Sequence, residues 1–99
     1  MAGTAITITL YDAETNEVKQ EYTRMFVPWK LLKAAVRLSK SLDMNNLSEE
    51  MVDSLAGLVV EVFGNKFSVD DLNQGADIGE MITVLNQVIA KAKGNLNPI

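Results

Sequence analysis

The chain changes its hydrophobic period once, and the change falls at Pro28. Before that proline, apolar and polar residues alternate, as in a half-buried strand. After it, apolar residues recur at spacings of three and four, as in amphipathic helices. We therefore predict an α+β fold in one domain spanning residues 1–99, with a β-hairpin over 4–27, a helical part over 28–94 and a flexible tail over 95–99.

Two strands make up the predicted hairpin. In the first strand, Ile6, Ile8 and Leu10 alternate with threonines, and β-branched residues favour strands. In the second strand the apolar residues that we place on one face are Val18, Tyr22 and Phe26. We predict a register with Leu10 opposite Val18 and Ile6 opposite Tyr22, because it brings the two apolar faces together. A lone hairpin is marginally stable in water, so it must pack on the helices or pair with another copy.

Three main helices and one short helical turn should follow the hairpin. Their predicted ranges are 28–42, 48–63, 68–75 and 77–94. Each begins at a proline, serine or aspartate, which suits the start of a helix. For the last helix we predict a capping box between Asp77 and Glu80. Gly57 costs its helix about 1 kcal/mol relative to alanine, so we predict a close helix approach there, the alternative being a glycine that is merely tolerated.

The chain contains neither cysteine nor histidine. Disulfides, thiolate nucleophiles, zinc fingers and imidazole catalysis are therefore excluded. The paired carboxylates 49–50 and 70–71 fall in the first turns of predicted helices, where capping and the helix dipole account for them. We expect no catalytic residue, no metal site and no cofactor, and we predict that the protein is not an enzyme.

The net charge of −4 argues against a nucleic-acid partner, since domains that bind phosphates are usually basic. No apolar stretch reaches the length of a membrane span, and the first residues lack the basic region of a signal peptide. We therefore expect no membrane partner and a cytoplasmic location. The sharpest charge feature is a basic stripe on the first helix: Lys30, Lys33, Arg37 and Lys40. A solvated helix face is the first interpretation, docking of an acidic partner the second and nucleic-acid binding the third.

Three runs carry a resemblance to a known family: 23–36 (TRMFVPWKLLKAAV), 55–67 (LAGLVVEVFGNKF) and 75–81 (GADIGEM). Together they resemble the tail assembly chaperones of long-tailed bacteriophages and prophages of Gram-positive bacteria. The resemblance implies a small α+β protein that binds the tape measure protein, the long helical rod that sets tail length. It also implies that the chaperone helps recruit tail tube protein, acts in the host bacterial cytoplasm and is absent from the mature virion.

The resemblance brings no defined binding site, so candidate contact residues come from pattern alone. The apolar hairpin face and the start of the basic helix supply them: Ile6, Ile8, Leu10, Trp29, Lys33 and Arg37. We expect homo-oligomers through the hairpin edge, although a lone tryptophan beside a proline more often belongs to the core. The alternative function is a small homo-oligomeric adaptor or regulator of mobile-element origin, which would form a closed dimer and ignore the tape measure protein.

Overall fold

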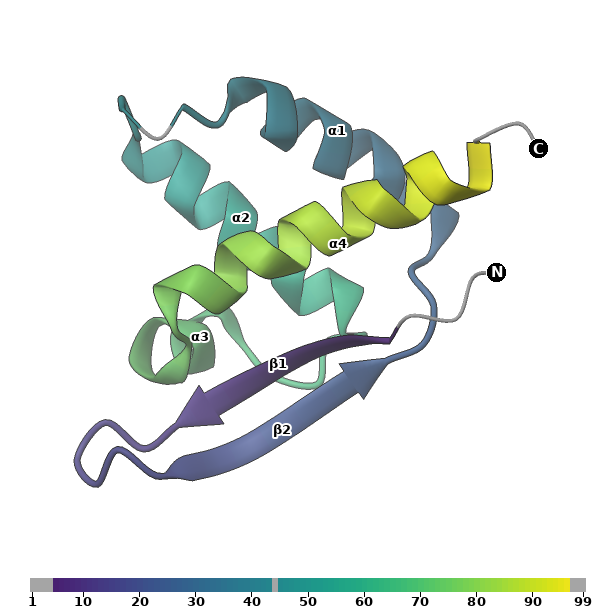
Figure 1. Ribbon diagram of the computed structural model, residues 1–99. Coiled ribbons are helices and arrows are strands. Elements are labelled where there is room, and N and C mark those ends of the chain that lie inside the picture. The colour runs from purple at the N-terminus through teal and green to yellow at the C-terminus, as the bar shows by residue number, and fades with distance from the viewer. Residues whose placement is uncertain (1–4, 44, 97–99) are drawn as a thin grey trace.

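The computed structural model describes residues 5–43 and 45–96 and confirms the α+β class (Figure 1). An antiparallel hairpin comes first, and helices follow it. The elements are β1 (Ile6–Tyr11), β2 (Val18–Arg24), the short 3-10 helix η1 (Trp29–Leu31), α1 (Leu32–Ser41), α2 (Glu49–Val62), α3 (Val69–Gly75) and α4 (Ile78–Leu96). In the described part of the chain, no helix has the length and apolar content needed to cross a membrane.

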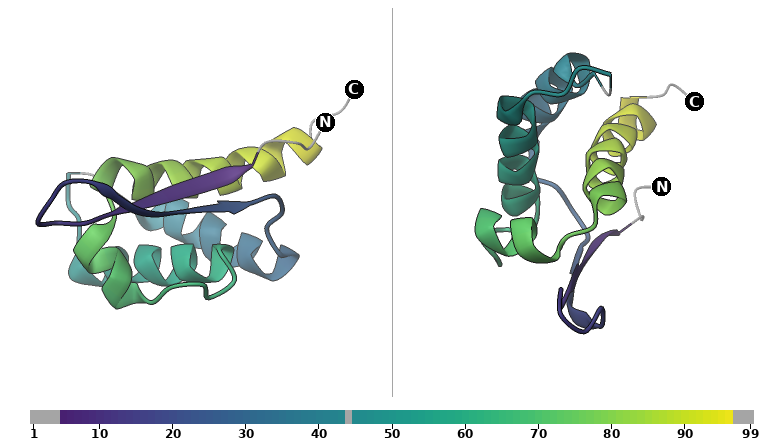
Figure 2. Two further views of the ribbon diagram at one scale, coloured as in Figure 1. Left: turned by 90° about the horizontal axis from the view of Figure 1, so that it is seen from below. Right: turned by 90° about the vertical axis from the view of Figure 1, so that its left-hand side faces the viewer.

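Helix α4 is the central element of the arrangement. It packs on β1 on one side and on α1 and α2 on the other, while α3 packs on β1 and α2. Figure 2 shows β1 running alongside α4, with β2 on the outer side of the hairpin. The hairpin therefore packs on the helices, which was one of its two predicted ways to become stable.

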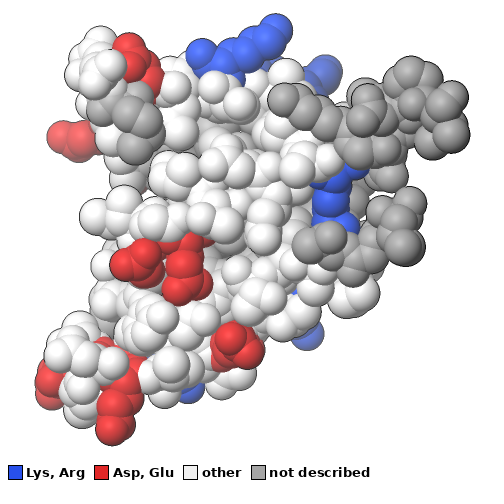
Figure 3. Space-filling model, viewed as in Figure 1, with Lys and Arg blue, Asp and Glu red and all other residues white. Residues whose placement is uncertain are grey.

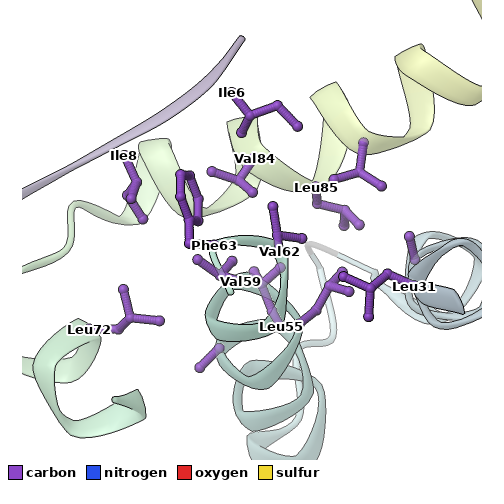
Figure 4. Close-up of a cluster of buried hydrophobic side chains, with 14 of the residues drawn as sticks. Ile6, Ile8, Leu31, Leu55, Val59, Val62, Phe63, Leu72, Val84 and Leu85 are labelled. Atoms are coloured by element: carbon purple, nitrogen blue, oxygen red, sulfur yellow. The ribbon is translucent and has the colours of Figure 1, made fainter. Parts of the chain in front are cut away.

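One hydrophobic core joins the hairpin to the helices (Figure 4). Its largest fully buried side chains come from β1, from α2 with the residue that follows it, and from α4: Ile6, Ile8, Val59, Val62, Phe63 and Val84. Burying a side chain of this size contributes about 1.5–3 kcal/mol of hydrophobic free energy. The inner face of β1 therefore belongs to the same core as the helices.

The observed register corrects the predicted one by two residues. Ile8 lies opposite Tyr22 and Leu10 opposite Gln20, and a bulge between Leu10 and Tyr11 then pairs Tyr11 with Val18. The connection is longer than predicted, because Asp12 accepts hydrogen bonds from two loop N–H groups and the loop needs the positive φ of Asn16. A two-residue shift keeps every regular strand residue on its face.

The inward face of β2 is narrower than predicted. Tyr22 is half-buried and its ring lies 4.8 Å from that of Phe67. Val18 and Phe26 are both more than 60% exposed, so their predicted place on the apolar face is wrong. The bulge explains Val18, since it pairs that residue with Tyr11 rather than with a core residue of β1.

The predicted capping residues mark the observed helix ends more accurately than the predicted terminal glycines do. Ser48 accepts a hydrogen bond from the N–H of Met51, and Ser68 and Asp71 form a complete capping box. At α4, Asp77 accepts from the N–H of Glu80, but the Glu80 carboxylate turns to β1 instead of completing the predicted box. Helix α4 also continues past position 94 to Leu96, because one glycine weakens a helix without ending it. The predicted tail at 95–99 is therefore helical at 95–96, and 97–99 lie outside the described residues.

The close backbone approach lies at a different glycine from the predicted one. A Cβ added to Gly57 would meet nothing within 4 Å, so the predicted helix approach at this position is wrong. A Cβ added to Gly75 would lie 2.8 Å from the carbonyl oxygen of Tyr11. Gly75 therefore lets the end of α3 approach the backbone of β1.

Candidate interaction surface

Two of the acidic side chains, those of Asp71 and Glu80, serve local structure. Ser68 holds the Asp71 carboxylate through its N–H at 2.9 Å, and these hydrogen bonds lower the pKa of Asp71 below its ordinary value of 3.8. The Glu80 carboxylate accepts from the Thr9 N–H at 2.9 Å and from the Tyr11 hydroxyl at 3.3 Å. Across residues 5–43 and 45–96, no three His, Cys, Asp or Glu side chains gather to hold a metal ion.

Large apolar side chains are exposed where the chain leaves the hairpin and enters η1. Met25 and Phe26 are largely exposed, and Trp29 is 83% exposed. A shallow groove then follows one side of α1, and Val36 is the exposed apolar residue along it. The groove is lined by Trp29, Lys30, Leu32, Lys33, Val36, Arg37 and Lys40.

We call this region the apolar–basic surface. It consists of Met25, Phe26, Trp29 and Val36 together with Lys30, Lys33, Arg37 and Lys40. The helical period creates the part of this surface that lies on η1 and α1, because only a narrow stripe of these helices is buried in the core. That stripe contains Leu31, Ala35 and Leu38. Side chains one and two positions further along the helix point outward, so exposed apolar residues lie beside cations.

Three polar contacts fix the part of this surface that precedes η1. The Arg24 Nε donates to the carbonyl oxygen of Phe26 at 3.1 Å, and the guanidinium lies 4.6 Å from the centre of the Phe26 ring. From α4, Lys91 Nζ donates to the carbonyl oxygen of Met25 at 3.3 Å. The exposed apolar residues therefore sit on a segment that is tied to both the hairpin and α4.

Charge is strongly segregated along the chain. All 13 acidic residues lie outside residues 22–42, and this segment contains five of the nine cations. In Figure 3, Lys and Arg lie at the upper edge, where α1 runs, and also at the right and lower edges, whereas Asp and Glu lie mainly on the left and lower left. An acidic protein thus carries one positive, partly apolar surface, which suits a partner with apolar residues flanked by carboxylates.

The structure separates the six predicted contact residues into two groups. Ile6, Ile8 and Leu10 are buried in the core, so their side chains cannot touch a partner while this fold is intact. The other three lie together on the apolar–basic surface: Trp29, Lys33 and Arg37. The expectation that a lone tryptophan belongs to the core is wrong here.

Sequence reasoning missed three members of this surface. The sequence pattern assigns Phe26 to the apolar face of the hairpin, and it proposes neither Met25 nor Val36 as a contact residue. The available signal was the apolar run from Met25 to Trp29. It breaks the period of two before the helical period starts, so neither pattern assigns these residues to a buried face.

Comparison with known protein families gives a match over nearly the whole chain. A family model described as phage tail chaperone protein matches residues 1–98. No curated protein and no solved structure matches the chain significantly. The matched range includes the core, the hairpin and the complete apolar–basic surface.

Proposed function

The chain belongs to the phage tail chaperone family and acts in tail assembly, and we propose that it does so by binding and solubilising the tape measure protein. It also helps recruit tail tube protein to the bound tape measure. The action is stoichiometric and non-catalytic, and it takes place in the host bacterial cytoplasm. The chaperone leaves when tube protein encloses the tape measure, so it is absent from the mature virion.

The observation that supports this proposal is the apolar–basic surface. A long helical rod exposes apolar stripes until the tube surrounds it, and such stripes lead to aggregation. The surface presents Trp29 and Val36 in a groove along a helix, the kind of site in which an amphipathic helix docks. Its solvent-exposed tryptophan is the residue type that most often dominates binding energy at interfaces.

The cations of the surface narrow the choice of client segment. Lys33 and Arg37 are one helical turn apart and both exposed, so they form a row beside the apolar groove. A client helix that places carboxylates on one flank of its apolar stripe would match this row. We therefore propose that the chaperone binds acidic amphipathic segments of the tape measure protein.

Co-expression with the tape measure protein from the same genome tests the proposal. We expect the chain to raise the soluble fraction of tape measure severalfold and to co-purify with it, and tube protein added to this complex should join it. Lys33→Glu combined with Arg37→Glu should abolish most of the gain, because both cations would then repel the carboxylates of the client. Lys66→Glu is the matched control, since Lys66 is an exposed cation outside the apolar–basic surface.

Two results decide between the steps of the proposal. No gain in soluble tape measure with the unaltered chain would reject tape measure binding. An undiminished gain with the double variant would reject the apolar–basic surface as the binding site. The helical far-UV signal of the double variant should equal that of the unaltered chain, since both substituted residues are exposed.

A further inference from the structure

Two exposed apolar residues of the apolar–basic surface lie on a connection without regular secondary structure. The connection spans residues 25–28, between the end of β2 and the start of η1. Val27 packs against the core, while the side chains of Met25 and Phe26 are exposed. The backbone of such a connection lacks the ladder hydrogen bonds of a strand or helix. Whatever holds the connection in place therefore determines how these two side chains are presented.

Arg24 holds the connection from the side of the hairpin. Its Nε donates to the carbonyl oxygen of Phe26 at 3.1 Å, and its guanidinium lies 4.6 Å from the centre of the Phe26 ring. The guanidinium also lies against Gly64, where an added Cβ would collide with Nη1 of Arg24. The turn after α2 therefore leaves the space that the guanidinium fills.

Lys91 holds the same connection from α4. Its Nζ donates to the carbonyl oxygen of Met25 at 3.3 Å, and Figure 1 shows the C-terminal half of α4 passing beside this connection. Arg24 and Lys91 are both half-buried, whereas the four cations of the apolar–basic surface are exposed. Two consecutive carbonyl oxygens thus accept hydrogen bonds from side chains of two different elements.

We propose that Arg24 and Lys91 are positioning residues for client binding. They hold the connection so that its exposed apolar side chains, and Trp29 directly after it, face outward before a client arrives. This inference rests on the proposed function and adds to it two residues outside the apolar–basic surface. A connection that is already ordered loses less conformational entropy when a client binds, so the same apolar contacts give tighter binding.

The alternative role for both residues is direct attraction of the client's carboxylates. The hydrogen bonds argue against this role, since each cation already donates to a backbone carbonyl of its own chain. The two roles also differ in what they predict for a substitution that displaces Arg24 without changing any charge.

Gly64→Ala is a substitution of this kind. Its methyl group should push the guanidinium away from Phe26, and it leaves the net charge unchanged. Asn65→Ala is the matched control, because Asn65 has a positive φ of 61° in the same turn and alanine is disfavoured there as well. The control strains the turn but adds no atom next to Arg24.

NMR relaxation of the backbone amides in the free chain measures how firmly the connection is held. We expect order parameters of about 0.85 for residues 25–27 of the unaltered chain, the value of a rigid backbone. Gly64→Ala and Lys91→Met should each lower them to about 0.6. Asn65→Ala and Lys91→Arg should leave them unchanged, since the arginine keeps both the charge and a donor for the Met25 carbonyl oxygen.

Co-expression with the tape measure protein measures the effect on the client. Gly64→Ala and Lys91→Met should each raise the amount of chain needed for half-maximal soluble tape measure by about threefold to tenfold, the change that loss of one hydrogen bond produces. Asn65→Ala and Lys91→Arg should need as much as the unaltered chain. The helical far-UV signal should be equal in all these proteins, which separates loss of positioning from loss of the fold.

Three results would overturn this inference alone. The first is an unchanged order of residues 25–27 in both Gly64→Ala and Lys91→Met, and the second is a loss of order that leaves the solubilisation of tape measure undiminished. The third is an equal loss of solubilisation with Gly64→Ala and Asn65→Ala. No soluble tape measure with the unaltered chain would instead reject the proposed function, and the role of the two cations in client binding with it.

Discussion

At the scale of single residues, two glycines show that the sequence alone does not tell which glycine is needed for close packing. Gly57 and Gly75 both lie inside or at the end of a helix, and the sequence suggests a packing role for the first. The structure assigns that role to the second, because the backbone of Tyr11 lies against Gly75 and open space surrounds Gly57. Which glycine has a close neighbour depends on how α3 packs on β1. In that contact Gly75 meets Tyr11, which is 64 positions earlier in the chain.

Alanine substitutions at these two positions should change the free energy of unfolding in opposite directions. Gly57→Ala should raise the free energy of unfolding by about 0.5–1 kcal/mol, because alanine restricts the unfolded chain and fits the open space. Gly75→Ala should lower the free energy of unfolding by about 1–3 kcal/mol, because its methyl group forces α3 away from β1. Urea unfolding of both variants measures the two changes. Equal effects at both positions would contradict this account of the packing.

At the scale of elements, the junction of α4 and β1 depends on one carboxylate. The Glu80 carboxylate accepts hydrogen bonds from the Thr9 N–H and the Tyr11 hydroxyl. An isolated antiparallel bridge between Leu10 and Ala76 also covers β1. Within the described residues β2 has no strand on its outer edge. That edge carries a bulge and the charged residues Lys19, Glu21 and Arg24, features that discourage strand pairing between copies.

The Glu80 junction predicts a change in both stability and titration. Glu80→Gln should lower the free energy of unfolding by about 1–2 kcal/mol, since hydrogen bonds to a charged acceptor are stronger than those to an amide. The Glu80 carboxylate, as the largest cause, raises the pKa of the Tyr11 phenol above its ordinary value of 10.0. The variant should bring this pKa back toward 10.0, as measured by the absorbance of phenolate.

The sign of the pH dependence follows from that raised pKa. Because the folded state holds the Tyr11 proton more tightly, the stability from this group is complete below pH 10.0 and is lost as the pH rises through the folded pKa. Glu80→Gln should lose less stability over that alkaline range. An identical alkaline loss in both proteins would contradict the assigned cause.

At the scale of the whole molecule, the change of hydrophobic period predicted most of the architecture. It separated the hairpin from the helices, and serine and aspartate caps placed the helix starts within a few residues. The register was not predictable from the pattern, because a shift of two residues leaves each face equally apolar. The exposure of Trp29 also could not be predicted from the pattern, since it depends on which face of η1 packs on the core.

The charge distribution connects this architecture to tail assembly. A chain with net charge −4 concentrates its cations on the segment that also exposes its largest apolar residues. Under the proposed function, the apolar–basic surface is the part of the molecule that binds the client.

Site-specific photo-crosslinking during co-expression with the tape measure protein tests this central claim most directly. A photoreactive residue at position 29 lies in the apolar–basic surface, and one at position 69 lies on α3, where Val69 is also exposed. We predict abundant crosslinks to tape measure from position 29 and few from position 69. Crosslinks from position 69 alone, or from neither position while tape measure stays soluble, would contradict the claim.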